Sequence, residues 1–154
     1  MADRNVLLKL AIKQIAYEQG KCVTFMAKLS EKMPGSSCHI HFSLKNSAGE
    51  NAFAGDEPLA EGITCSVTMK HFLAGWIKYI PELMPFYAPT VNSYKRFSKD
   101  WAPANRAWGI DNRSCGFRIC GEGKNVHIEC RIPGADANCY LAFAASYACG
   151  LKGI

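Results

Sequence analysis

The segment Gly35-Ser-Ser-Cys-His-Ile-His-Phe-Ser43 decides the fold, together with a second short segment that reads His127-Ile-Glu-Cys-Arg131. Both segments alternate polar and apolar residues, which is the period of a β-strand with one buried face. The polar sets that share a face are His39, His41 and Ser43 on the first strand and His127, Glu129 and Arg131 on the second. If both strands lie in one sheet, a metal site formed by His39 and Glu129 lies beside Arg131 and Ser43, which can bind an anion. The two segments therefore predict a site for a phosphorylated or carboxylated substrate and a divalent cation.

Length and composition indicate one globular domain with a hydrophobic core. The chain has 154 residues, of which 49% are hydrophobic and 20% are charged, so it is long enough and apolar enough to fold. No apolar run reaches the ~18 residues that span a bilayer. Met1 is followed by Asp3 and Arg4 rather than by the apolar segment of a signal peptide. We therefore expect a cytoplasmic protein with no membrane partner.

Eight cysteines occur without a Cys-x-x-Cys spacing, and several lie inside apolar runs, such as Cys22, Cys65 and Cys149. This pattern indicates reduced, mostly buried thiols rather than disulfides. It also gives zinc no suitable ligand spacing.

The net charge of +5 comes mostly from residues 88–131, which hold eight Lys or Arg against four Asp or Glu. The arginines are spaced singly through apolar, strand-like sequence, which suits small anions better than a nucleic acid. We expect no nucleic-acid partner.

Hydrophobic periodicity predicts three helices and several strands. The helices cover 3–19, 64–80 and 138–151; prolines from Pro81 onward end the second, and the third is apolar nearly all round and therefore buried. The strands cover 21–29, 39–44, 107–110, 116–120 and 126–132. Residues 51–63 and 92–108 show little regular pattern. Helices mixed with hairpin-linked strands predict an α+β fold, an antiparallel sheet with packed helices.

Six short strings, in this order, resemble the catalytic domain of glutamine synthetase. They are Thr24-Phe-Met-Ala-Lys28, Gly35…His39-x-His41-x-Ser43, Asn92-Ser-Tyr-Lys-Arg96, Asn112-Arg-Ser114 with Arg118, Glu129-x-Arg131, and Asn138-x-Tyr-Leu-Ala-Phe-Ala-Ala145. The resemblance covers nearly the whole chain. It implies an enzyme that uses ATP to phosphorylate the γ-carboxylate of glutamate and then lets ammonia or an amine attack the γ-glutamyl phosphate. Glutamate, ATP and the amine are the implied partners, and a homo-oligomeric ring is the implied assembly.

The resemblance implies a role for each candidate residue. His39 and Glu129 look like ligands of Mg²⁺ or Mn²⁺, which histidine nitrogen and carboxylate oxygen suit. The expected glutamate contacts are Gly35, Arg96 and Arg131. The expected ATP or phosphate contacts are His41, Ser43, Arg113, Arg118 and Lys124, of which Arg113 and Arg118 are also the expected catalytic residues. His127 stands where relatives often carry arginine.

Single residues also have simpler interpretations. A histidine such as His39 is often only hydrogen-bonded, Glu129 with Arg131 fits an ordinary ion-pair face, and Arg113 fits a solvated turn. The ordered match favours the site over these interpretations. A relative that kept the fold only as a structural or regulatory protein would have no reason to hold six costly polar side chains together. These are His39, Arg96, Arg113, Arg118, Glu129 and Arg131.

Departures from the family pattern bear on the acceptor. Relatives that use ammonia carry a loop of the form R-x-x-P-G-x-E-A-P, whereas this chain reads Arg96-Phe-Ser-Lys-Asp-Trp-Ala-Pro103, one residue shorter and without the glutamate. Trp101 directly precedes Ala-Pro and can pack on an alkyl or aryl amine, and Asp100 is the nearest carboxylate. Gly35-Ser-Ser37 replaces Gly-Ser-Gly. The sequence resembles the branch that makes γ-glutamyl amides of larger amines, such as polyamines or ethanolamine, with ammonia as the alternative acceptor.

The resemblance also predicts that residues 1–154 are a middle section of a longer protein. The amino-terminal domain, the acidic segment that supplies further metal ligands, and the stretch after the last helix have no counterpart in the sequence. We therefore expect the isolated chain to lack ligase activity and to self-associate through uncovered apolar surface.

Overall fold

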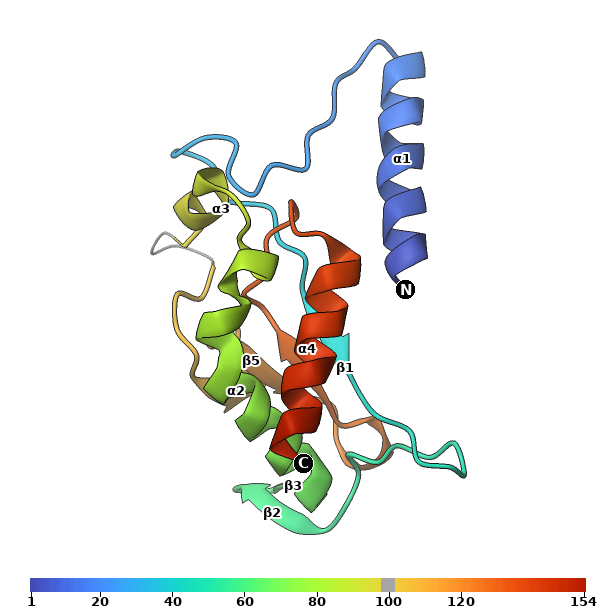
Figure 1. Cartoon of the computed structure of the whole chain (residues 1–154), viewed down its shortest axis with the longest axis vertical. Helices are drawn as coiled ribbons and strands as arrows, with labels where there is room; N and C mark the ends of the chain where they lie inside the picture. Colours follow the sequence, from blue (N-terminus) through green and yellow to red (C-terminus); the bar gives the residue numbers. More distant parts are fainter. Residues whose placement is uncertain (98–101) are drawn as a thin grey trace.

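A four-stranded sheet in the order β1-β6-β5-β4 forms the centre of the molecule, and two long helices pack against it (Figure 1). The computed structural model describes residues 1–97 and 102–154. The helices are α1 (Ala2–Glu18), α2 (Val67–Tyr87), α3 (Val91–Lys95) and α4 (Cys139–Gly153). The strands are β1 (Ile40–Phe42), β2 (Glu57–Ala60), β3 (Ile63–Cys65), β4 (Trp108–Ile110), β5 (Phe117–Cys120) and β6 (His127–Cys130), with a 3₁₀ turn at Gly123–Asn125. The predicted α+β fold is confirmed.

The strand register separates an apolar face of the sheet from a polar face. β6 pairs antiparallel with β1 and with β5, which places His41 and Arg118 on either side of Glu129. The next row contains Phe42 opposite Ile128, and it points the other way, into the core. The polar row therefore lies on the face away from α2 and α4.

The edge strand β4 runs parallel to β5, which is an exception to the predicted antiparallel sheet. The chain leaves β4 at Ile110 and returns through residues 111–116 to begin β5 opposite Trp108. Asp111 takes a left-handed backbone conformation at this turn, with φ of 45°, and its amide donates to Ile119 O at 2.9 Å. The strands expected at 107–110 and 116–120 are present, but they do not form a hairpin.

The core lies between the sheet and the helix pair α2 and α4. The helical period of the apolar residues Met69, Phe72, Leu73, Trp76, Ile77 and Ile80 predicts a buried stripe on α2. The stripe packs in the core, where Phe72 and Trp76 are fully buried. The ring of Trp76 packs edge-on against Phe117 of β5, with centroids 5.3 Å apart. The two helices cross closely because a glycine stands at the contact: a Cβ on Gly150 would lie 2.1 Å from the ring of Phe72.

A buried chain of hydrogen bonds ties α2 to α4. The indole Nε1 of Trp76 donates to the hydroxyl of Tyr87 at 2.7 Å, and that hydroxyl bonds to Ser146. The Ser146 hydroxyl donates to Ala142 O at 2.5 Å, so the Tyr87 hydroxyl is the donor to Ser146. The polar side-chain atoms of Trp76, Tyr87 and Ser146 thus each have a hydrogen-bond partner within the protein.

The strand predicted at 21–29 is wrong. The segment is irregular. The backbone groups of Ala27 and Lys28 bond to a loop and to a side chain that is distant in sequence. The amide of Lys28 donates to Asn92 Oδ1 at 3.0 Å, and Lys28 O accepts from Asn92 Nδ2 at 2.6 Å. Ala27 O accepts from Ser36 N at 2.9 Å. β-propensity predicted a strand, but strands also need a neighbour to pair with.

The predicted helix boundaries need correction as well. α2 does not end near residue 80 but continues through Pro81 and Pro85, because burial of Leu83 and Tyr87 offsets the lost helical hydrogen bonds. The segments that showed little pattern contain the β2–β3 hairpin and α3. α4 is not buried all round, since one side of it is exposed, including Tyr147.

α1 lies beside the rest of the molecule and contacts mainly α4 (Figure 1). Lys9 Nζ donates to Ala135 O at 2.6 Å. The residues Leu8, Ala11, Ile12, Ile15 and Ala16 recur at helical spacing on α1. Of these, Ala16 is buried, whereas Leu8 and Ile15 are exposed.

All eight cysteines are free thiols, as predicted, although Cys22 is exposed rather than buried. Among residues 1–97 and 102–154, no helix is long and apolar enough to cross a bilayer.

Candidate active site

Glu129 is the centre of the polar face of the sheet. Its side chain is 3% exposed, and its Oε1 lies 3.0 Å from His39 Nδ1 and 3.7 Å from His41 Nε2. Arg131 Nη1 donates to Oε1 at 2.9 Å, and Arg118 Nη1 donates to Oε2 at 3.0 Å. The expected convergence of His39 and Glu129 on one face is therefore present in the structure.

The electrostatics of this cluster fix its charge state. Burial alone would raise the pKa of Glu129, but the hydrogen bond from Arg118 and the charge of Arg131 outweigh it and hold that pKa below its usual value. Burial and the charge of Arg131 lower the pKa of His39 to about 4, against the pull of Glu129. Burial likewise lowers the pKa of His41. Near neutral pH the cluster thus combines an ionised carboxylate with neutral imidazoles, the form in which histidine binds metals.

Arg118 is held between two carboxylates. Its Nε donates to Asp111 Oδ1 at 2.8 Å while its Nη1 reaches Glu129. The hydrogen bond with Asp111 raises the pKa of Arg118, and the same bond lowers the pKa of Asp111. Asp111 is a site residue that sequence reasoning missed. Its only signal was its place in the turn before the Asn112-Arg-Ser string.

The structure places Arg113 differently from Arg118. Its side chain is exposed in the turn between β4 and β5. Its carbonyl oxygen accepts a hydrogen bond from Arg131 Nε at 3.1 Å, and its charge contributes to the lowered pKa of Asp111. Arg113 therefore borders the cluster and helps to aim Arg131 through its backbone.

A cavity of about 170 Å³ opens beside His39. Its lining includes Lys28, Gly35, Ser37, His39, Arg96 and Arg131. Among the described residues, this lining holds three cationic side chains and no carboxylate, so the cavity suits an anion. Two of the three expected glutamate contacts, Arg96 and Arg131, supply part of that charge, and the third, Gly35, forms part of the wall.

Arg96 is fixed almost completely by the backbone around it. It is 4% exposed, and its Nη1 and Nη2 donate to Ile132 O at 2.7 Å and Arg131 O at 3.0 Å. Burial and the neighbouring charge of Arg131 lower its pKa to about 10, which leaves it cationic at neutral pH. Gly35 lies against this side chain. A Cβ at Gly35 would come within 2.6 Å of Ala27 O and 2.8 Å of Arg96 Cγ, so only glycine fits there.

A second cavity of about 340 Å³ lies at the other end of β1. Its lining includes Ser43, Lys45, Lys124 and His127, so it gathers two of the expected ATP contacts. His41 stands between the two cavities, and its ring lies 5.3 Å from that of His127. The expected nucleotide contacts therefore do not form one group: Ser43 and Lys124 lie at this cavity, and Arg118 lies on the far side of Glu129.

Two further predictions have different outcomes. Trp101 and Asp100, on which the acceptor hypothesis depends, lie outside the described residues. In the described part of the chain, no three His, Cys, Asp or Glu side chains converge as a complete metal site. His39 and Glu129 therefore offer a pair of donors rather than a full coordination shell.

Comparisons with known proteins identify the family of the chain. The family model of the glutamine synthetase catalytic domain matches residues 1–154. The chain is 46% identical over 153 residues to a γ-glutamylethanolamide synthetase of Streptomyces coelicolor, covering 99% of this chain and 32% of that protein. It is 44% identical over 155 residues to a glutamate–isopropylamine ligase of Pseudomonas sp., covering 99% of this chain and 33% of that protein. It is 41% identical over 155 residues to a glutamine synthetase of Pyrococcus abyssi, covering 99% of this chain and 34% of that protein.

The structural comparison gives the same family. A solved GmaS–ADP complex superposes with a TM-score of 0.89 at 36% identity, covering 99% of this chain and 35% of that one. The chain spans about a third of the length of the curated relatives it matches. Because the family model matches every residue and the relatives align along nearly the whole chain, the chain belongs to the glutamine synthetase family, within its catalytic domain.

Proposed function

We propose that this chain is the glutamate-binding and phosphate-binding part of an ATP-dependent ligase. The ligase joins the γ-carboxylate of glutamate to an amine through γ-glutamyl phosphate. The observation that carries the proposal is the Glu129 cluster: an ionised, buried carboxylate between Arg118 and Arg131, beside a small cavity lined by cations. Phosphoryl transfer depends mainly on positioning and on neutralising charge, which is what such a cluster provides.

The roles proposed for the residues follow their places around Glu129. Arg96 and Arg131 bind the carboxylates of glutamate in the cavity of about 170 Å³, against the wall that Gly35 forms. Ser43 and Lys124, with His41 beside them, contact the nucleotide at the second cavity.

The arginines on the other side of Glu129 are proposed to act in the transfer itself. Arg118, held rigid by Asp111, faces the charge that develops on the transferring phosphoryl group. Arg113, whose side chain is exposed on the turn, supplies positive charge to the same anion.

His39 and Glu129 fit a divalent cation. Adjacent ligands of an octahedral Mg²⁺ at about 2.1 Å lie about 3 Å apart. The donors His39 Nδ1 and Glu129 Oε1 are separated by 3.0 Å. When bound, Mg²⁺ or Mn²⁺ supplies positive charge to the phosphate oxygens. We propose that further donors come from other segments of a longer protein, and that the 154-residue chain alone therefore lacks ligase activity.

An organic amine is the proposed acceptor. One relative is named as a γ-glutamylethanolamide synthetase and another as a glutamate–isopropylamine ligase. In addition, Trp101 precedes Ala102 where ammonia users carry a glutamate. Ammonia is the second candidate, favoured by the 41% identity to archaeal glutamine synthetases. We also propose, from the family, a cytoplasmic homo-oligomeric ring.

Phosphate release from ATP tests the proposal. The complete protein that carries this chain is incubated with ATP, Mg²⁺ and glutamate, and with ethanolamine, isopropylamine, putrescine or ammonium in turn. We expect phosphate release that requires both glutamate and an amine, with a γ-glutamyl amide as product. Release that is independent of glutamate, or the absence of release with every amine, would overturn the proposal.

A further inference from the structure

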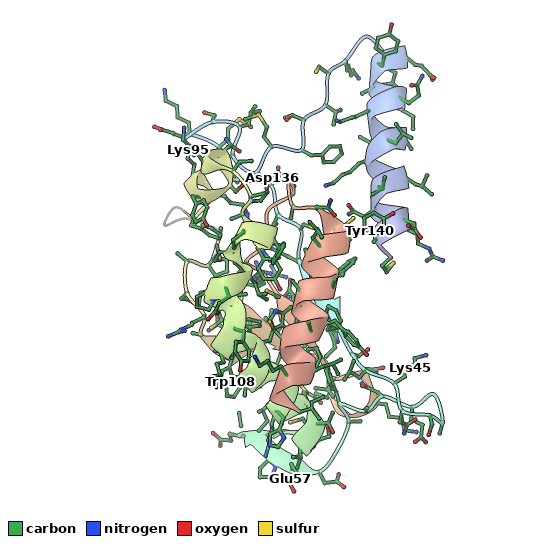
Figure 2. All side chains as sticks on the ribbon, viewed as in Figure 1. Lys45, Glu57, Lys95, Trp108, Asp136 and Tyr140 are labelled. Atoms are coloured by element: carbon green, nitrogen blue, oxygen red, sulfur yellow. The ribbon has the colours of Figure 1, made fainter. Side chains whose placement is uncertain are left out.

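The loop that follows β6 bonds to segments beside the cavity of about 170 Å³, which we call the anion cavity. Its residues 133–137 lie between α3 and the start of α4, where Figure 2 labels Asp136. The amide of Ala135 donates to Ser36 O at 3.0 Å, and the amide of Gly134 donates to Tyr87 O at 3.0 Å. The loop thus holds the glycine-containing wall on one side and the end of α2 on the other.

Asp136 extends this connection to α3. Its Oδ2 accepts hydrogen bonds from Ser93 Oγ at 2.6 Å and from Thr90 Oγ1 at 3.3 Å. Thr90 and Ser93 are the two members of the capping box that begins α3. A helix of five residues is too short to be stable by itself, so its orientation depends on such contacts.

Arg96 follows directly after α3 and takes its backbone position from it. The amide of Arg96 donates to Ser93 O at 3.1 Å. The guanidinium, at the other end of the side chain, donates to the carbonyls of Arg131 and Ile132, which directly precede the Asp136 loop. The two ends of Arg96 are therefore held by the two partners that Asp136 joins.

The carboxylate of Asp136 has no other described function. Its Oδ1 is buried and has no hydrogen-bond partner among the described residues. Its charge supports the cationic form of Arg96, against burial and the repulsion of Arg131. A buried, half-satisfied carboxylate is costly, so a role beyond capping is warranted.

We propose that Asp136 is a positioning residue for glutamate: by holding Ser93 and Thr90 it fixes α3, and through α3 it aims Arg96 into the anion cavity. The proposal rests on the proposed function, in which that cavity binds glutamate. Asp136 does not touch the substrate, and it acts only through Arg96.

Steady-state kinetics of the complete ligase test this role. Asp136→Ala and Ser93→Ala each remove the same link from opposite sides. Since a misplacement of about 1 Å can cost up to about 100-fold, we expect each to raise the KM for glutamate about tenfold. The KM for ATP should stay within about twofold. The double variant should be no worse than the single ones, because residues that share one interaction are not additive.

Two controls separate positioning from general damage. Asp136→Asn keeps an oxygen that can accept from Ser93 and should restore most of the glutamate affinity. Ser66→Ala removes a comparable helix cap, the one at α2 that accepts from Met69 N at 3.1 Å, far along the chain from the cavity. It should leave the KM for glutamate unchanged.

Several results would overturn the inference. They are an unchanged glutamate KM in the single variants, a multiplied effect in the double variant, and an equal rise in Ser66→Ala. The unsubstituted ligase separates the two levels: if it does not use glutamate, the proposed function itself fails, whereas normal turnover with an indifferent Asp136 refutes only the positioning role.

Discussion

Replacing Glu129 with alanine should destabilise the fold strongly, even with no ligand present. The carboxylate accepts from Arg131 at 2.9 Å and from Arg118 at 3.0 Å, and the side chains of these arginines are 10% and 18% exposed. Removing one partner of a buried ion pair costs about 3–5 kcal/mol, because the remaining charge stays buried without compensation. Arg118 keeps Asp111 as a partner, and Arg131 keeps the carbonyl of Arg113. We therefore expect about 3 kcal/mol, the lower end of that range.

Urea unfolding of the 154-residue chain at pH 7 with EDTA measures this loss, since EDTA removes any contribution from a bound cation. Glu57→Ala is the matched control. It removes an exposed carboxylate 3.5 Å from Lys70, and such surface pairs contribute about 1 kcal/mol or less. Glu129→Gln keeps the shape and one acceptor and should fall between the two. A loss below about 1 kcal/mol for Glu129→Ala would refute the reasoning that this carboxylate neutralises the two arginines.

Further predictions concern the core, the histidine and the acceptor. Tyr87→Phe leaves the buried Trp76 Nε1 without its acceptor and should cost about 1–3 kcal/mol in urea unfolding, whereas Tyr79→Phe, on the same helix, should cost little. The lowered pKa of His39, about 4, keeps it neutral in the folded chain at pH 5.5, where an unfolded histidine is mostly protonated. The free energy of unfolding should therefore decrease as the pH is lowered from about 6.5 to about 4, because the unfolded chain then binds the proton more readily. An imidazole NMR signal from a protonated His39 at pH 5.5 would contradict this. In the complete ligase, an organic amine should be preferred over ammonia by about tenfold or more in kcat/KM, because Trp101 offers apolar surface and no proton acceptor; equal turnover of ammonia would count against this.

The sequence predicted the centre of the site better than its edges. Strict alternation in the segments around His41 and Glu129 placed the polar residues of each strand on one face, because side-chain direction in a strand depends on residue parity. The register of β1 against β6 then brings the two polar faces to the same side of the sheet. The alternation could not show that β4 runs parallel to β5, since that depends on the turn at Asp111. For the same reason it missed the ion pair between Asp111 and Arg118.

The errors in the fold have a common physical cause, which is tertiary context. Residues 21–29 have the composition of a strand, but the backbone of Lys28 bonds to the Asn92 side chain and that of Ala27 to a loop. α2 passes two prolines because the buried ring of Tyr87 lies beyond them. Asp136 was invisible in the sequence, since a lone aspartate in a loop carries no periodic signal, and only the contacts with Ser93 and Thr90 give it a role.

The position of the two cavities at opposite ends of β1 has a kinetic consequence. Three residues of extended chain separate them, and the residues that would hold the donor and the acceptor of the phosphoryl group lie on one polar face. With glutamate and ATP in the sites proposed above, both substrates can be bound at the same time, without either leaving before the other enters. Such an arrangement calls for a sequential kinetic scheme with a ternary complex, in which double-reciprocal plots for ATP and glutamate intersect instead of running parallel.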